Sequence, residues 1–304
     1  MISINDGPCN SYIQVCCNKE DQVLQPPPPT LNSTRGCGYR RPNGAGFQIT
    51  GDEKNESQFG EFPWMTAILG NDSYQCGGAL IHTNAVITAA HCVTHREKKF
   101  KVRVGEWDTQ HTSEPYPYQE SVVKSITIHP NYYAGALYND IAFLLLEEPV
   151  KISENVDLAC LPPQNYTSNK GRCYATGWGK KVFDKEKTHQ AILKKIDLPL
   201  VPRRTCQDKL RTTRLGNLFT LHESFLCAGG ELGKDTCLGD GGSPLVCPIE
   251  GQEDRYYQAG VVAWGIGCGD EDVPGVYADV AFLRDWIDDQ MKFNNLDTAG
   301  YNFL

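Results

Sequence analysis

Thirteen cysteines are spread along this chain of 304 residues, and they constrain its folding more than any other feature. They are not grouped into the Cys-x-x-Cys pairs typical of zinc sites, so a framework of disulfides is the better interpretation. Four Asn-x-Ser/Thr sequons, at Asn32, Asn55, Asn71 and Asn165, agree with passage through an oxidising secretory route. The sequence therefore predicts a secreted, extracellular glycoprotein.

The composition excludes two classes of function. The chain carries a net charge of −8, whereas a nucleic-acid-binding protein needs an excess of Lys and Arg to meet phosphates. No apolar run approaches the roughly 20 residues that a membrane helix requires. Hydrophobic residues make up 40% of the chain, which is enough for a globular protein with a packed core.

The amino-terminal residues do not have the pattern of a signal peptide. Residues 1–12 contain no apolar stretch and already reach a cysteine at Cys9. Because the number of cysteines is also odd, we expect the chain to begin partway into a longer product.

The sequence divides into four parts. Residues 1–20 are a short cysteine cluster, and residues 21–43 are a linker whose run Pro26 to Pro29 favours extended polyproline II. Residues 44–292 contain short apolar stretches separated by Gly, Pro, Asn and Asp, which is typical of an all-β barrel or sandwich. Residues 293–304 form a tail.

One segment near the carboxyl end has a different period. Four apolar side chains recur there at helical spacing, namely Val280, Leu283, Ile287 and Met291. The pattern predicts an amphipathic helix that packs on the barrel.

Three segments carry residue types used in nucleophilic catalysis. The first segment, TAAHC at residues 88–92, places His91 beside a cysteine. The second, NDIAFLLL at residues 139–146, places Asp140 before an apolar strand. The third is a glycine-rich loop that holds Asp240 and Gly241 between two cysteines. In this order the segments resemble the chymotrypsin-like, or trypsin-fold, serine proteases. Flanking motifs that share the resemblance are FPWM, CGGALI, TGWG, LCAGG, VVAWGIGCG and PGVY. The resemblance covers residues 44–292 and implies a chymotrypsin-like double β-barrel with a carboxy-terminal helix.

The same resemblance shows that the hydroxyl of the nucleophile is missing. In the family, a serine attacks the substrate carbonyl, the residue at the position of His91 acts as general base, and the one at Asp140 orients the imidazole. The serine position of the family motif GDSGGP falls on Gly241, which has no side chain. Ser243 lies two residues further on, about 6.6 Å along extended chain, too far to replace it. Loss of the triad serine costs on the order of 10⁶ in turnover, so we expect a serine protease homologue without protease activity.

Activation by cleavage also departs from the family pattern. In trypsin-like zymogens, cleavage after Arg or Lys frees an Ile or Val amine that pairs with the Asp before the nucleophile, here Asp240. Ile49 is the nearest such start, but it follows Gln48, which is not a tryptic site. Ala263 also replaces a serine that the family usually carries before its Trp-Gly segment.

The resemblance implies two further sites. Asp235, Gly265 and Gly275 match the specificity pocket of trypsin-like members, so they form either a vestigial pocket for an Arg or Lys side chain or an inherited structure without a ligand. Residues 103–108 fall where many members begin a calcium loop. Glu106, Asp108 and Glu120 are its candidate oxygen ligands, with a plain acidic surface loop as the alternative.

The family pattern also pairs ten of the cysteines. The implied disulfides are Cys76–Cys92, Cys173–Cys247, Cys206–Cys227, Cys237–Cys268 and Cys37–Cys160. The remaining Cys9, Cys16 and Cys17 resemble the last three cysteines of an arthropod clip domain, so residues 1–20 are interpreted as its carboxy-terminal part.

A partial clip segment, a proline-rich linker and a protease-like domain without its serine together resemble the clip-domain serine protease homologues of arthropod haemolymph. The resemblance implies a non-catalytic cofactor or adaptor in an extracellular proteolytic cascade, with prophenoloxidase and clip-domain proteases as partners, and assembly after cleavage. The implied process is prophenoloxidase activation in melanisation, a part of innate immunity. Two alternatives stay open: a microbe-surface recognition or adhesion protein, and an active trypsin-like endopeptidase, which Gly241 disfavours.

Overall fold

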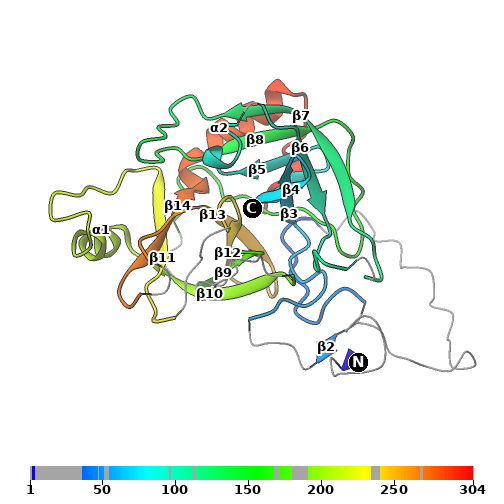
Figure 1. Cartoon of the computed structure of the whole chain (residues 1–304), viewed down its shortest axis with the longest axis horizontal. Helices are drawn as coiled ribbons and strands as arrows, with labels where there is room; N and C mark the ends of the chain where they lie inside the picture. Colours follow the sequence, from blue (N-terminus) through cyan, green and yellow to red (C-terminus); the bar gives the residue numbers. More distant parts are fainter. Residues whose placement is uncertain are drawn as a thin grey trace, which may run out of the picture.

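The computed structural model describes residues 2–3, 36–46, 48–50, 55–95, 97–111, 114–167, 171–179, 191–233, 240–267 and 270–303. In this part of the chain, two six-stranded antiparallel sheets each close into a barrel, and the two barrels lie side by side (Figure 1). The predicted all-β double barrel with a carboxy-terminal helix is confirmed. The segment predicted to be part of a clip domain and the linker up to residue 35 lie outside the described residues, apart from β1 (Ile2–Ser3), which pairs in parallel with β2 (Ile49–Thr50).

The first barrel is built from the amino-terminal half of the domain. Its strands follow the order β3-β4-β5-β8-β7-β6. Their bounds are β3 Met65–Gly70, β4 Ser73–His82, β5 Ala85–Thr88, β6 Phe100–Val104, β7 Gln119–Ile128 and β8 Ala142–Leu146. Every residue of β3 and β5 is buried, so these strands appear in the sequence as short continuous apolar runs rather than as an alternating pattern. The short 3₁₀ helix η2 (Ala90–Cys92) follows β5 and carries His91.

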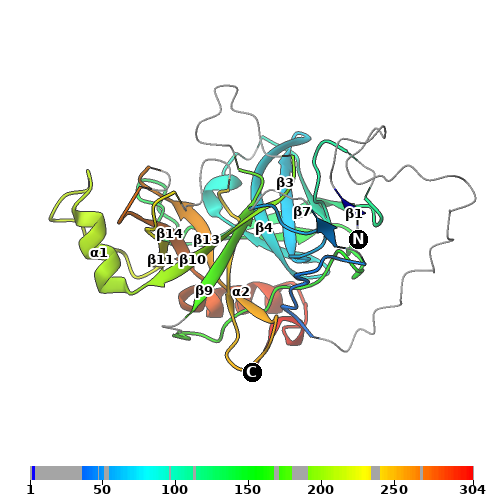
Figure 2. The same ribbon diagram turned by 90° about the horizontal axis from the view of Figure 1, so that it is seen from below.

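The second barrel follows the order β10-β11-β14-β13-β12-β9. Its strands are β9 Arg172–Gly177, β10 Lys194–Val201, β11 Phe225–Gly229, β12 Pro244–Pro248, β13 Tyr256–Trp264 and β14 Pro274–Asp279. Helix α1 (Arg203–Arg211) follows β10 and projects from the outer edge of this barrel in both views (Figure 1 and Figure 2). The disulfide Cys206–Cys227 ties the helix to β11.

Helix α2 (Val280–Phe293) is the predicted amphipathic helix, and its four periodic apolar residues are all buried. Asp279 caps it, because its Oδ1 accepts hydrogen bonds from the backbone N–H groups of Ala281 and Phe282. Beyond α2, the tail forms the 3₁₀ helix η3 (Ala299–Tyr301) and packs back on it, with Tyr301 fully buried. None of the described helices is long and apolar enough to cross a membrane.

Four of the five disulfides implied by the family pattern are present, and one of them anchors the segment that precedes the barrels. They are Cys37–Cys160, Cys76–Cys92, Cys173–Cys247 and Cys206–Cys227. The fifth, Cys237–Cys268, lies outside the described residues, as do Cys9, Cys16 and Cys17.

A buried ion network reinforces the anchoring by Cys37. The guanidinium of Arg40 donates two hydrogen bonds to the Oε1 of Glu61, at 2.9 and 2.6 Å, and lies 4.3 Å from the ring centre of Tyr174. The ammonium of Lys195 in β10 lies 2.8 Å from the Oε2 of the same glutamate, whose side chain is fully buried. The amino-terminal segment is therefore joined to the second barrel by charge, through Glu61 and Lys195, as well as being anchored by a disulfide.

Candidate active site

The residues at the base and orienting positions meet at the junction of the two barrels. The Nδ1 atom of His91 lies 2.6 Å from the Oδ2 of Asp140, and the backbone N–H of His91 donates to the Oδ1 of the same carboxylate at 2.9 Å. Asp140 is fully buried just before β8. A carboxylate held against Nδ1 keeps the proton of the neutral imidazole on that nitrogen, so Nε2 is left as the proton acceptor.

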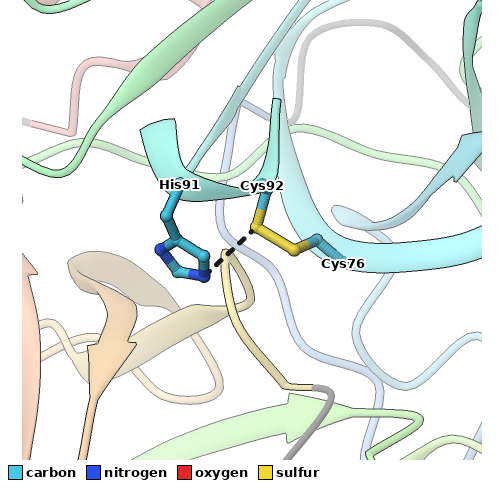
Figure 3. A group of neighbouring side chains, drawn as sticks. All are labelled: Cys76, His91 and Cys92. Atoms are coloured by element: carbon cyan, nitrogen blue, oxygen red, sulfur yellow. Dashed lines mark hydrogen bonds between the residues drawn. A yellow bond between two sulfur atoms is a disulfide. The ribbon is translucent and has the colours of Figure 1, made fainter. Parts of the chain in front are cut away.

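Residue 241 is a glycine, so it places no side chain in front of Nε2 of His91. A Cβ atom placed on Gly241 would lie 2.7 Å from Nε2 of His91 and 3.3 Å from its Cε1. The imidazole therefore occupies volume that even an alanine at this position would need. Figure 3 shows Nε2 directed toward the disulfide Cys76–Cys92, with Sγ of Cys92 3.6 Å away.

Ser243 is not an alternative nucleophile. The residue is fully buried, and a Cβ atom placed on Gly77 in β4 would overlap its Oγ. The same Oγ lies 3.3 Å from the position of a Cβ on Gly177, at the end of β9. The hydroxyl is therefore enclosed between the two barrels, where a polypeptide substrate has no access.

Asp240 is packed inside the glycine-rich segment that resembles TGWG of the family. Its Oδ1 accepts a hydrogen bond from the backbone N–H of Gly179 at 2.9 Å, and a Cβ on Gly177 would overlap the same oxygen. Ile49, the residue whose amine would pair with this carboxylate after family-like activation, instead belongs to β2.

Sequence reasoning did not identify Tyr74 as a neighbour of Asp240. Burial, together with the negative charge of Asp240, raises the pKa of the Tyr74 phenol well above its usual range. The ring makes an edge contact with Trp178, at 6.0 Å between centroids. Tyr74 lies in β4, two residues before Cys76. This position indicates that the residue is on a strand, but it does not indicate that its side chain lies near Asp240.

The specificity pocket is only partly described. Gly265 is exposed after β13, and Gly275 is buried in β14 opposite Ala228 of β11. Asp235, the carboxylate expected at the base of the pocket, lies outside the described residues. Its role stays a prediction.

The three candidate calcium ligands are not brought together around one cation. The guanidinium of Arg103 lies between two of them, 2.7 Å from the Oε2 of Glu106 and 2.7 Å from the Oε1 of Glu120. The carboxylate of Asp108 lies 2.6 Å from Nδ1 of His111. Because an arginine already stands where the cation would have to lie, this set of side chains does not fit Ca²⁺.

A second cluster with metal-ligand atoms is also unsuited to a metal. Sγ of Cys76, Sγ of Cys92 and a ring nitrogen of His91 lie within 4.8 Å of one another. The two sulfurs form a disulfide, however, and the ligand that metals require is the thiolate.

Three of the four sequon asparagines, Asn55, Asn71 and Asn165, are exposed, as an acceptor of a glycan must be. Asn32 lies outside the described residues. Exposure is compatible with glycosylation at the three positions, which remains a prediction.

Comparison with known proteins identifies the architecture and several relatives. The trypsin family model matches residues 51–287. The chain is 52% identical to phenoloxidase-activating factor 2 of Galleria mellonella, over 93% of this chain and 98% of that protein. It is 36% identical to inactive CLIP domain-containing serine protease A28 of Anopheles gambiae, over 93% of this chain and 78% of that protein. It is 44% identical to inactive CLIP domain-containing serine protease A3 of Aedes aegypti, over 83% of this chain and 53% of that protein.

Proposed function

This chain belongs to the trypsin family, and we propose that it is a non-catalytic member that acts as a cofactor or adaptor in an extracellular proteolytic cascade. The observation that carries the proposal is the pairing of an intact His91–Asp140 hydrogen bond with a glycine at residue 241. Acyl transfer in this family needs a hydroxyl at that position, and Ser243 is enclosed. A protease scaffold that retains its fold but lacks a nucleophile retains its surfaces for binding.

The proposed process is the activation of prophenoloxidase. Support comes from the similarity to phenoloxidase-activating factor 2, which extends over nearly the whole of both chains, and from relatives whose names describe inactive proteases. The proposed partners are prophenoloxidase and the clip-domain proteases that cleave it. Secretion into haemolymph belongs to the same proposal, and exposed sequons at Asn55, Asn71 and Asn165 support it.

Reconstitution tests the cofactor role. Purified prophenoloxidase and its activating protease are combined with and without this protein, after limited cleavage of the protein by an upstream clip protease. We expect phenoloxidase activity to rise several-fold only when the protein is present. Unchanged activity would overturn the proposal, and capture on bacteria or β-glucan would then favour the surface-recognition alternative.

A matched variant separates binding from hidden catalysis. His91→Ala removes the general base, so any residual hydrolysis by this chain would be lost, whereas a cofactor role depends on other surfaces. We expect the variant, provided that it remains folded by circular dichroism, to support activation as well as the wild type. Labelling of the wild type by a fluorophosphonate at trypsin-like rates would contradict the non-catalytic assignment.

A further inference from the structure

A cavity of about 160 Å³ lies beside the amino-terminal end of α1, away from the triad positions. Its walls come from the end of β10, from β11 and β13, from the start of α2 and from residues 162–167. Pro202, Arg203 and Thr167 line it and are exposed, so the cavity opens to solvent on their side.

Most of the lining is apolar or aromatic. The side chains that define this character are Pro162, Tyr166, Leu200, Phe225, Leu226 and Tyr257. An engineered cavity of about 150 Å³ in another protein binds benzene, so a volume of this size and character holds one aromatic or large aliphatic side chain. It is too small for a drug-sized ligand, for which pockets of roughly 300 Å³ or more are usual.

The two charged side chains of the lining, Asp279 and Arg203, already make hydrogen bonds. Asp279 accepts two backbone hydrogen bonds as the cap of α2. The Nη1 of Arg203 donates to the carbonyl of Phe225 at 3.0 Å, and its Nη2 donates to the carbonyl of Leu221. The guanidinium is therefore fixed at the mouth of the cavity, where it interacts electrostatically with Asp279 of the lining. It forms no ion pair with any of the described residues.

Arg204 follows directly and adds a second positive charge. Its side chain is exposed, and within the described part of the chain no hydrogen bond or ion pair reaches it. The first turn of α1 contains no acidic residue. Because the amino-terminal end of a helix carries a partial positive charge, a cation there destabilises the helix, so helix stability does not account for the two arginines.

We propose that the α1 pocket, the cavity together with Arg203 and Arg204, docks an acidic segment of a partner protein that inserts one apolar side chain. The cavity holds an anchor of the size of one side chain, and Arg203 at its mouth, with Arg204 next in the chain, pairs with carboxylates that neighbour the anchor. Buried apolar anchors surrounded by arginine are typical of the groups that dominate binding energy at protein interfaces.

The local charge, and not the charge of the whole chain, favours this occupant. At a net charge of −8, the protein as a whole repels acidic molecules, so an acidic segment is attracted only by a local concentration of cations such as this one. A sulfated polysaccharide would use the arginines but leave the apolar cavity unfilled. The inference rests on the proposed function only in that an adaptor requires such a partner.

Fluorescence anisotropy with short labelled peptides tests the pocket. The probe is Gly-Glu-Glu-X-Glu-Glu-Gly, with X as Phe, Leu, Tyr or Trp, measured at 50 mM NaCl and compared with the same peptide carrying Gly at X. We expect at least one anchored peptide to bind at least tenfold more tightly than the Gly peptide, since burial of a large apolar side chain contributes that much. We also expect the affinity to fall as the salt concentration rises.

Two pairs of variants locate the binding. Arg204→Glu should weaken the peptide at least tenfold, whereas Arg214→Glu should change it less than about threefold. Arg214 is the matched control, because it is exposed and lies beyond the carboxyl end of the same helix, at least about 10 Å along the axis. Thr167→Trp should fill the mouth of the cavity and abolish the difference between anchored and Gly peptides. Because that change also removes the sequon of Asn165, it is compared with Asn165→Gln.

Several results would overturn the inference. The first is the absence of binding by every anchored peptide up to 1 mM, and the second is an equal loss of affinity in Arg204→Glu and Arg214→Glu. The third is peptide binding that heparin displaces and that Thr167→Trp leaves intact, which would indicate a polysaccharide site. Self-association in sedimentation that Arg204→Glu abolishes would indicate a second copy of this chain as the occupant. Since the peptide assay contains no cascade protein, its failure and the failure of the cofactor role are separate outcomes.

Discussion

Replacement of Gly241 by serine should not create a protease. A serine Cβ would lie 2.7 Å from Nε2 of His91, whereas ordinary contacts of a Cβ begin near 3.4 Å, so the ring would have to move by several tenths of an ångström. The ring is held by its 2.6 Å hydrogen bond to Asp140, and hydrogen bonds to charged groups contribute about 1.5–3 kcal/mol. We therefore expect Gly241→Ser to lower the free energy of unfolding by about 2 kcal/mol. For a domain of this size, that corresponds to a Tm lower by about 4–8 °C.

Activity on Arg-amide substrates should stay near background in the same variant. A base displaced from its orienting carboxylate is no longer aligned with the new hydroxyl. We also expect that tryptic processing does not produce the activating amine, because Gln48 precedes Ile49. The double variant Gly241→Ser with Gln48→Arg, cleaved by trypsin, should hydrolyse the amide measurably faster than the single variant. Fluorophosphonate labelling reports the nucleophile independently of turnover.

Two controls separate steric conflict from chemistry. Gly241→Ala introduces the same Cβ without a hydroxyl, so it should lose as much stability as the serine variant and show no labelling. His91→Ala removes the ring, so Gly241→Ser should cost little stability in that background, and the double-mutant cycle measures the difference. A Gly241→Ser protein as stable as the wild type and efficiently labelled would refute the reasoning.

Three other predictions follow from buried charges. The Tm should not change between millimolar Ca²⁺ and a chelator, because Arg103 occupies the space between the candidate ligands and a native-state ligand would raise the Tm. Burial raises the pKa of Glu106 to about 7 from its ordinary value of 4.5, so the folded state binds more protons than the unfolded state between these values. The free energy of unfolding should therefore fall by on the order of 1–3 kcal/mol as the pH rises from about 4.5 to 7, and Glu106→Gln should remove that slope in urea titrations. Arg40→Met should lower the free energy of unfolding by about 3 kcal/mol, because Glu61 would keep only Lys195 as a cationic partner, whereas Arg40→Lys should lose less.

The sequence predicted the architecture because the relevant signals are local or come from the family pattern. Helix α2 followed from the period of four apolar residues, each of which is buried. The barrels and the four observed disulfides followed from the resemblance to trypsin-like proteases, since motifs fix the strand order that brings distant cysteines together. The approach of His91 to Asp140 was implied in the same way.

Features that depend on side-chain placement were not predictable. Glu106 and Glu120 were predicted as ligands because residues 103–108 fall where many members of the family begin a calcium loop, but the pattern did not show that Arg103 of β6 lies between them. Similarly, the α1 pocket collects residues from segments between 162 and 281, and no local motif marks that convergence. Such sites depend on contacts between distant strands, and local patterns in a single sequence do not reveal which strands come together.

The retained His91–Asp140 pair has a structural explanation that does not involve catalysis. The carboxylate of Asp140 accepts from both the backbone N–H and the ring of His91, so it joins η2 to the segment that leads into β8. Removal of the histidine ring would leave a fully buried carboxylate with only one of these two bonds, and an unsatisfied buried charge costs more than the hydrogen bond that it loses. The disulfide Cys76–Cys92 fixes the same turn to β4. Residue 241 makes no comparable contribution to stability, because it is a glycine and the imidazole of His91 occupies the volume that a side chain there would need. A protein that no longer needs the reaction can therefore lose the nucleophile without loss of stability, while the base and its carboxylate remain because they join two segments of the first barrel.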